Sequence, residues 1–291
     1  MTFESPPLAG KTALVTGVSR RKGIGFAVAR RFAELGANVF IQHYSPHDTL
    51  QPWGGDNLDE VRAGIRAAQS ETAMFADLSL DLALQDSARP LIEAAFGLTG
   101  ALDILVCNHA RSGSDGSIFD MTPEQLDGHW QVNTRSTLLL TRAFADRFSG
   151  HKVAEPARPG ERPEHAGPID EFATGRVIWM TSGQIQGAMP GEVAYATSKA
   201  ALAGITPTVA SELLARGIIL NTINPGPVNT GYLDPETTDR PLEEIQAFVR
   251  NTPFGRFGNP DDPARLIGWL ASDEGRWIVG QVLTTDGGLG L

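Results

Sequence analysis

The stretch from residue 11 to residue 42 constrains the fold of this chain more than any other. It begins with a short β-rich apolar run at residues 11–16 and ends with a second one at residues 37–42. Between them lie a glycine-containing loop and a segment, residues 26–36, whose apolar side chains recur at helical spacing. A strand, a helix and a strand in this order predict a βαβ unit, with two parallel strands and a right-handed crossover.

The same alternation continues to the end of the chain. Five further strands and six further helical stretches are indicated by their apolar patterns. The predicted strands are residues 72–76, 102–107, 176–181, 218–223 and 281–285, and the predicted helices are residues 61–70, 87–96, 123–148, the stretch from residue 195, 242–250 and 263–271. We therefore predict an α/β fold of the Rossmann type, a doubly wound three-layer sandwich around a parallel sheet of about seven strands.

We expect a single domain over residues 1–291, because strands and helices alternate without a linker. Two connections interrupt the rhythm. Residues 149–174 contain four prolines and many charges, and we interpret them as a surface excursion. Residues 225–251 are long and polar, with a helical core, and are either a substrate lid or a plain crossover.

Composition excludes several classes of protein. The single cysteine, Cys107, rules out a disulfide framework within the chain and favours a reducing compartment, so we expect a cytoplasmic protein; Cys107 itself is expected in the core. We expect neither an export signal nor a membrane segment. The net charge of −10 argues against a nucleic-acid partner. His43 and His47 have a helical metal-ligand spacing but lie in a proline-containing loop, and we expect no metal site.

The first loop predicts a phosphate site. Glycines at positions 17, 23 and 25 follow a strand and open a helix, where free N–H groups and the helix dipole favour an anion such as a pyrophosphate. The second strand ends in Gln42, His43 and a tyrosine, with no carboxylate for a ribose 2′-hydroxyl before Asp48. We therefore expect NADP (NADPH), its 2′-phosphate bound by cations at positions 20–22. NAD is the alternative, with those cations solvated on an exposed loop.

Tyr195 and Lys199 form a second candidate pair. Their i,i+4 spacing places both side chains on one face of a helix. A nearby ammonium favours the phenolate over the phenol, whose ordinary pKa is roughly 10, so the pair could exchange a proton at neutral pH. An ordinary helical pair has the same spacing, and the pattern alone is weak.

Taken together, these motifs resemble those of the classical short-chain dehydrogenases/reductases over essentially the whole chain. The loop from Thr16 to Gly25 resembles the family's glycine motif, with two residues more between Gly17 and Gly23. The tetrad positions are matched by Asn133, Ser182, Tyr195 and Lys199. The cofactor contacts expected from the loop chemistry and the resemblance are Gly17, Ser19, Arg20, Arg21, Lys22, Gly23, Ile24, Gly25, His43, Asp77, Leu78, Asn108, Ala110, Tyr195, Lys199, Pro225, Gly226, Val228 and Thr230.

The resemblance implies a mechanism. Tyr195 would give a proton to the oxygen of a carbonyl that receives hydride, Ser182 would hydrogen-bond that oxygen, and Lys199 would lower the pKa of Tyr195 and bind the nicotinamide ribose. Asn133 would hold a water that links Lys199 to solvent. Two departures from the family pattern lie near the nicotinamide position, where His109 replaces an Asn and Arg111 replaces a Gly.

Three functions are compatible with these residues. The C-terminal stretch 253–288 is most similar to 3-oxoacyl-(acyl-carrier-protein) reductases, which implies an NADP-dependent ketoreductase acting on an acyl thioester or a related small carbonyl. The second is an NAD-dependent dehydrogenase of a secondary alcohol, sugar or polyketide-type substrate. The third is a dinucleotide-sensing regulatory or scaffold protein, against which the complete tetrad argues. The family is commonly tetrameric, so we expect a homotetramer, or a homodimer.

Overall fold

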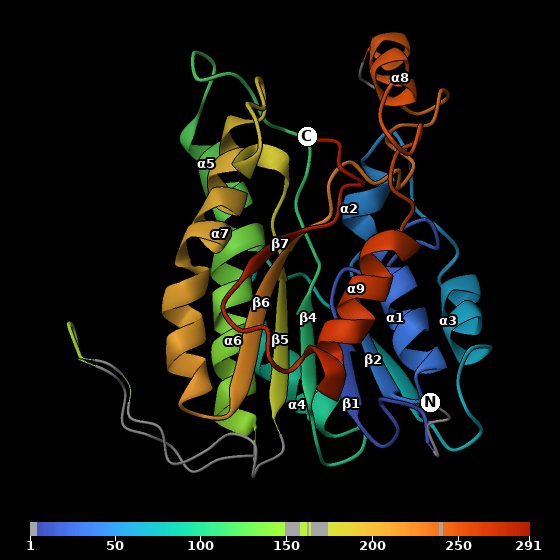
Figure 1. Cartoon of the computed structure of the whole chain (residues 1–291), viewed down its shortest axis with the longest axis vertical. Coiled ribbons are helices and arrows are strands. Elements are labelled where there is room, and N and C mark those ends of the chain that lie inside the picture. Colours follow the sequence, from blue (N-terminus) through green and yellow to red (C-terminus); the bar gives the residue numbers. More distant parts are fainter. Residues whose placement is uncertain (1–4, 149–157, 162, 164–173, 239–240) are drawn as a thin grey trace.

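The computed structural model describes residues 5–148, 158–161, 163, 174–238 and 241–291. One parallel sheet extends across it in the order β3-β2-β1-β4-β5-β6-β7 (Figure 1). The strands are β1 (Thr12–Val15), β2 (Asn38–His43), β3 (Phe75–Ser79), β4 (Ile104–Cys107), β5 (Gly175–Met180), β6 (Ile218–Asn224) and β7 (Val282–Thr284). The order reverses between β1 and β4, and ligands of doubly wound sheets bind at such a switch point.

Helices cover both faces of the sheet, which gives the three predicted layers (Figure 1). On one face lie α1 (Ile24–Glu34), α3 (Leu58–Arg66) and α9 (Asp261–Ala271). On the other lie α4 (Ala88–Phe96), α6 (Ser136–Arg147) and α7 (Val193–Leu214). The remaining helices are α2 (Ser45–Thr49), α5 (Pro123–His129) and α8 (Leu242–Arg250), with short 3₁₀ turns at Gly183–Ile185 and Asp273–Gly275. The predicted fold class is therefore confirmed.

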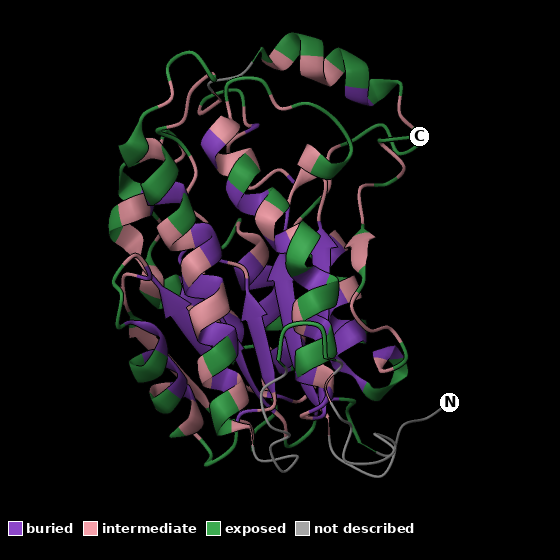
Figure 2. Ribbon diagram, turned by 90° about the vertical axis from the view of Figure 1, so that its left-hand side faces the viewer, coloured by how far each residue is buried: buried purple, intermediate pink, exposed green. Residues whose placement is uncertain are grey.

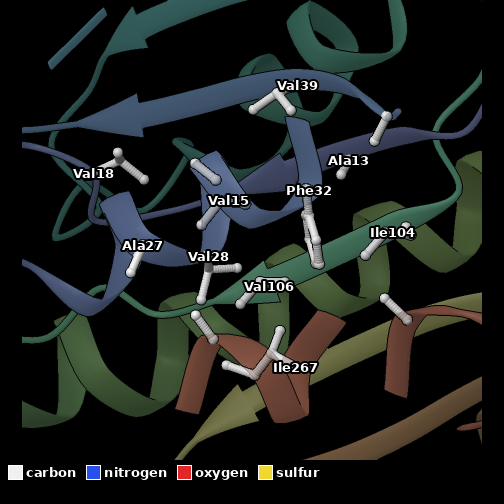
Figure 3. Packing of buried hydrophobic residues seen from close by; sticks show 14 of the residues in the cluster. Ala13, Val15, Val18, Ala27, Val28, Phe32, Val39, Ile104, Val106 and Ile267 are labelled. Carbon is white, nitrogen blue, oxygen red and sulfur yellow. The ribbon is translucent and has the colours of Figure 1, made fainter. Parts of the chain in front are cut away.

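The core has one apolar layer on each side of the sheet. Strands β1, β4, β5 and β6 are buried along their whole length, as expected for central parallel strands covered on both faces (Figure 2). On the α1 and α9 side, Val28 and Phe32 pack with Val106 and Ile267 (Figure 3). Cys107 belongs to the opposite layer, where burial raises the pKa of its thiol. It is a core residue, as predicted.

The largest differences from the predicted elements are at β3, at α3 and after β2. Strand β3 starts three residues later than expected, so Asp77 and Leu78 lie within it rather than after it. Helix α3 starts earlier, because Asn57 caps its first turn by accepting from the backbone N–H of Asp59 (2.9 Å). The short helix α2 follows β2 where a loop was expected. Most of the predicted surface excursion at 149–174 lies outside the described residues.

The predicted helix at 123–148 is interrupted. It starts at α5, where Thr122 forms a capping box with Gln125, continues through a π-helical segment, Trp130–Arg135, and ends as α6. π-Helical turns are rare and are frequent at functional sites. This segment carries Asn133. The sequence pattern did not predict it, because the pattern assumes 3.6 residues per turn.

Candidate active site

The glycine loop is packed tightly against the end of β4. Gly17 has a φ of +71°, and a Cβ atom there would lie 2.7 Å from the Cα of His109. A Cβ atom on Gly25 would lie 2.6 Å from the carbonyl oxygen of Gly17 and 2.6 Å from the Nδ2 of Asn108. Since Asn108 Nδ2 donates to the Gly17 carbonyl (3.2 Å), any larger residue would displace the loop from β4.

The start of α1 fits a dinucleotide pyrophosphate. Gly23 stands at the N-cap position, no side chain caps the helix, and the first turn contains no acidic residue. The first backbone N–H groups of the helix, from Ile24 on, thus make no hydrogen bond to a capping side chain. Such a helix start suits an anion, because its donors and its dipole both favour negative charge.

The three cations of the loop are each paired with a carboxylate. Arg20 Nε lies 3.2 Å from Asp48, Arg21 Nη2 lies 2.7 Å from Asp56, and Lys22 Nζ lies 2.7 Å from Asp234. The Arg20 guanidinium is also over the ring of Trp53, 5.5 Å from its centroid, and its Nη1 donates to the carbonyl of Thr230 (2.7 Å). The loop is therefore connected to the segment after β6, and a phosphate at these cations would compete with carboxylates.

The end of β2 offers no carboxylate for a ribose diol. Asp48, the first acidic residue after the strand, accepts a hydrogen bond from the Ser19 hydroxyl and is paired with Arg20. Asp77 is held by Arg62 (2.8 Å) and by the Nε2 of His43 (3.0 Å), and the hydrogen bond from Arg62 is the main cause that lowers its pKa. The predicted cofactor contacts of Asp77 and Leu78 stay predictions.

His109 is a buried connector between β1, β4 and the π-helical segment. Its Nδ1 lies 2.7 Å from the Thr16 hydroxyl, and its Nε2 lies 3.0 Å from the carbonyl oxygen of Val132 and 2.6 Å from the hydroxyl of Ser136. A carbonyl only accepts, so Nε2 carries the proton and Nδ1 accepts from Thr16. Burial lowers the pKa of His109 to about 3, and the ring is neutral at physiological pH.

Tyr195 and Lys199 lie on one face of α7, as their spacing predicted. Lys199 Nζ is 5.8 Å from the centroid of the Tyr195 ring and donates to the carbonyl of Met180 at the end of β5 (2.9 Å). The Lys199 side chain is buried, and this desolvation lowers its pKa to about 8. The ammonium form therefore predominates at pH 7, close to its titration range, beside a phenol ring.

Ser182 comes two residues after the carbonyl that holds Lys199. The intervening Thr181 donates from its hydroxyl to the carbonyl of Lys199 (2.9 Å), which fixes β5 against α7. Within the described part of the chain, no residue hydrogen-bonds to the Ser182 hydroxyl. Three of the four tetrad residues thus lie around the junction of β5 and α7.

Asn133 joins the same junction from the π-helical segment. Its Oδ1 accepts from the backbone N–H of Arg111 (2.7 Å), and its Nδ2 donates to the hydroxyl of Ser198 (2.9 Å) and the carbonyl of Arg111 (3.2 Å). The side chain is fully buried. Its amide is thus occupied in clamping the loop after β4 to α7, a contact that the sequence did not reveal; its expected role in holding a water stays a prediction.

The segment after β6 closes the other side of the site. Gly226 has a φ of +65° and donates from its N–H to the Oδ1 of Asn224 (3.1 Å), while Val228 pairs with Gly258 in an isolated bridge. The predicted cofactor contacts of Pro225, Gly226, Val228 and Thr230 stay predictions. The predicted helix at 242–250 is present as α8.

Sequence reasoning missed the contacts that Asp48, Trp53, Asp115 and His129 make with the predicted site residues from distant positions. No local motif marks them, because each acts through a partner far away in the sequence. Among the described residues there is no group of three or more metal-ligating side chains. No helix in the described part of the chain is long and apolar enough to span a membrane.

Comparison with known proteins identifies the family. Residues 17–153 and 164–290 match the family model described as enoyl-(acyl carrier protein) reductase. The chain is 35% identical over 280 residues to an uncharacterized oxidoreductase of Bacillus subtilis, covering 96% of each chain. It is 30% identical to the 3-oxoacyl-[acyl-carrier-protein] reductase of Rickettsia conorii, covering 97% of this chain and 98% of that one. The chain therefore belongs to the short-chain dehydrogenases/reductases and is an oxidoreductase of that family.

A solved structure agrees with this assignment. The short-chain dehydrogenase of Burkholderia cenocepacia, crystallised in complex with NADP, superimposes with a TM-score of 0.75 at 30% sequence identity. The match covers 98% of this chain and all of the other. The seven-stranded parallel sheet and its flanking helices are thus the fold of this family, and the family assignment supports an NAD(P)-dependent enzyme.

Proposed function

We propose that this protein is an NADPH-dependent ketoreductase that reduces a 3-oxoacyl thioester or a related small carbonyl to the secondary alcohol. The observation that carries the proposal is the Tyr195–Lys199 pair, with Lys199 buried beside the phenol and fixed to the end of β5. A phenol next to a desolvated ammonium gives up its proton more readily, and the packing of this pair holds the phenol in a fixed position.

The residues of the chain divide the chemistry between them. When bound, the dinucleotide supplies the hydride. Tyr195 holds the proton that the substrate oxygen receives, and the charge on Lys199 favours the phenolate left behind. The Ser182 hydroxyl, which has no partner among the described residues, is available to donate to the same oxygen and to stabilise its developing charge.

Two features support NADP over NAD. Both acidic side chains near the end of β2, Asp48 and Asp77, are held by cations or by a hydroxyl, so neither is free for a ribose 2′-hydroxyl. Arg20, which is paired with Asp48 just after β2, can exchange this carboxylate partner for a 2′-phosphate. The relative from Burkholderia cenocepacia was crystallised with NADP, which is compatible with this choice.

The test is a turnover screen that crosses both cofactors with four substrate classes: a 3-oxoacyl thioester, a ketone, an enoyl thioester and a secondary alcohol. We expect oxidation of NADPH with an acetoacetyl thioester or a simple ketone, and weaker activity with NADH. A crotonyl thioester belongs in the screen because the matching family model is described as an enoyl reductase. If only the crotonyl thioester is turned over, the protein reduces a carbon–carbon double bond, and the proposed carbonyl reduction is wrong.

The other outcomes decide between the remaining functions. Tighter binding of NADH than of NADPH in a fluorescence titration, with oxidation of secondary alcohols, would favour the NAD-dependent dehydrogenase. Dinucleotide binding without turnover of any substrate would favour a sensing or scaffold protein.

A further inference from the structure

The helix that carries Tyr195 starts without a cap of its own. Glu192 occupies the N-cap position of α7 but makes no capping hydrogen bond with its side chain, and the first turn contains no acidic residue. Tyr195 is the third residue of this helix, so its backbone N–H is one of the donors that the helix cannot satisfy internally. The position of the phenol therefore depends on what holds this first turn.

Asp115 supplies the missing cap from a different part of the chain. It lies in the connection between β4 and α5, and its Oδ2 accepts from the backbone N–H of Tyr195 (2.7 Å) while its Oδ1 accepts from that of Ala194 (3.0 Å). Its side chain is only 7% exposed. A buried carboxylate with two donors at a helix N-terminus makes the charge-assisted form of a cap, which also complements the helix dipole.

The connection that carries Asp115 is itself fixed on both sides of the site. Asn133 clamps the backbone N–H and carbonyl of Arg111. His129, at the end of α5, has its Nε2 3.1 Å from the carbonyl of Gly113, and its ring meets the Tyr195 ring edge-on with centroids 6.1 Å apart. The loop from Arg111 to Asp115 thus spans from the π-helical segment to the first turn of α7.

We propose that Asp115 is a positioning residue for the reaction, which holds Tyr195 at its working position by capping α7 from the β4–α5 connection. The proposal rests on the proposed role of Tyr195 as proton donor. Asp115 need not touch substrate or cofactor, because its contacts are with the backbone of the residue that does. Displacement of a reacting group by about 1 Å can reduce turnover about a hundredfold.

The test compares Asp115→Ala with Asp115→Asn, using the best substrate of the wild-type protein. Alanine removes both acceptors, and we expect kcat to fall 10- to 100-fold while the KM for NADPH changes less than threefold. Asparagine keeps one acceptor oxygen, and we expect it to restore kcat to within about fivefold of the wild type. If Asp115 only stabilised the fold, Asp115→Ala would not lower kcat selectively while leaving the KM for NADPH unchanged. Asp115→Asn would then also not restore kcat.

Thr122→Ala is the matched control. Thr122 caps α5 on the same connection, with its hydroxyl accepting from the N–H of Gln125 (3.3 Å), but it has no contact with α7 in this role. We expect Thr122→Ala to lower thermal stability to a similar degree as Asp115→Ala and to leave kcat within twofold of the wild type. Equal losses of kcat in both alanine variants, or an unchanged kcat in Asp115→Ala, would overturn the proposal.

Hydrogen exchange gives a readout that does not depend on activity. In the intact wild-type chain the amides of Ala194 and Tyr195 should be protected, and in Asp115→Ala they should exchange at least tenfold faster, with the rest of α7 unchanged. If no substrate is turned over, this result would support the cap while the proposed function fails. Equal protection of these amides in the wild type and in Asp115→Ala would contradict the cap itself. If Asp115→Ala does not fold, Asp115→Asn takes its place in the test, and absence of protection of these amides in Asp115→Asn would also contradict the cap.

Discussion

At the scale of single residues, His109 stands where the family resemblance predicts an Asn, and it connects three parts of the fold. The ring fills the position of the usual Asn, and both of its nitrogens are used, one toward Thr16 and one toward the π-helical segment. A neutral imidazole suits these partners, because one nitrogen must accept and the other must donate. The fold therefore keeps this ring unprotonated far below its ordinary pKa of roughly 6.5.

This has a consequence for stability in acid. The folded-state pKa of about 3 lies below the unfolded value, so the unfolded chain takes up a proton first and stability is lost as the pH falls below about 6.5. Between pH 7.5 and pH 5 the free energy of unfolding should lose about 2 kcal/mol from this residue alone. This contribution is absent in His109→Asn. Denaturant titrations should therefore show that the difference in the free energy of unfolding between the wild type and His109→Asn narrows by about 2 kcal/mol from pH 7.5 to pH 5.

The comparison of the wild type with His109→Asn cancels the pH dependence of stability that comes from other titrating groups. His47 and His129, whose pKa values are also lowered by burial, are present in both proteins. Parallel pH profiles for wild type and His109→Asn would mean that the ring does not stay neutral in the fold.

At the scale of secondary structure, one outer face of the α5–α7 region is unusually apolar. Trp130 is 45% exposed, Leu126 39% and Ile205 37%. A hollow of about 310 Å³ lies beside Leu126 and Trp130, and it is also lined by Asp127, Ala194, Thr197 and Ser198. A large aromatic side chain beside a hollow is typical of contact surfaces, and we propose this face as a subunit interface of the expected homotetramer.

Light scattering tests the assembly. We expect the wild-type chain of 31.1 kDa to scatter as a four-chain particle, and Trp130→Glu to reduce the particle to dimers or monomers, because a buried charge at the interface is costly. Leu84→Glu, at another exposed apolar position, serves as the control and should leave the mass unchanged. A monomeric wild type would contradict the proposal.

At the scale of the whole molecule, the sequence predicted the sheet better than the site. Runs rich in Leu and Ile such as 102–107 and 218–223 predicted strands clearly, since central parallel strands are apolar on both faces. The tetrad could be named from spacing and resemblance. The contacts that hold it could not, because Asp115 is 80 residues from Tyr195 and the Asn133 amide is aimed by a π-helical turn that no local pattern announces.

The sheet brings these distant parts together at its carboxyl edge. Strands β1, β4 and β5 end beside one another, which places the glycine loop, Asn108 and the Met180 carbonyl next to the start of α7. We propose that Tyr195 in this setting is the proton donor of a dinucleotide-dependent oxidoreductase.

The most direct test is Tyr195→Phe, which removes the phenolic oxygen and keeps the ring that packs beside His129 and Lys199. We expect kcat for carbonyl reduction to fall at least a hundredfold, the order of magnitude of a lost general acid, while the Kd for NADPH stays within about threefold of the wild type. Stopped-flow turnover and a fluorescence titration on the same preparation give both numbers. Undiminished turnover with normal NADPH binding would contradict the assignment of Tyr195 as the proton donor.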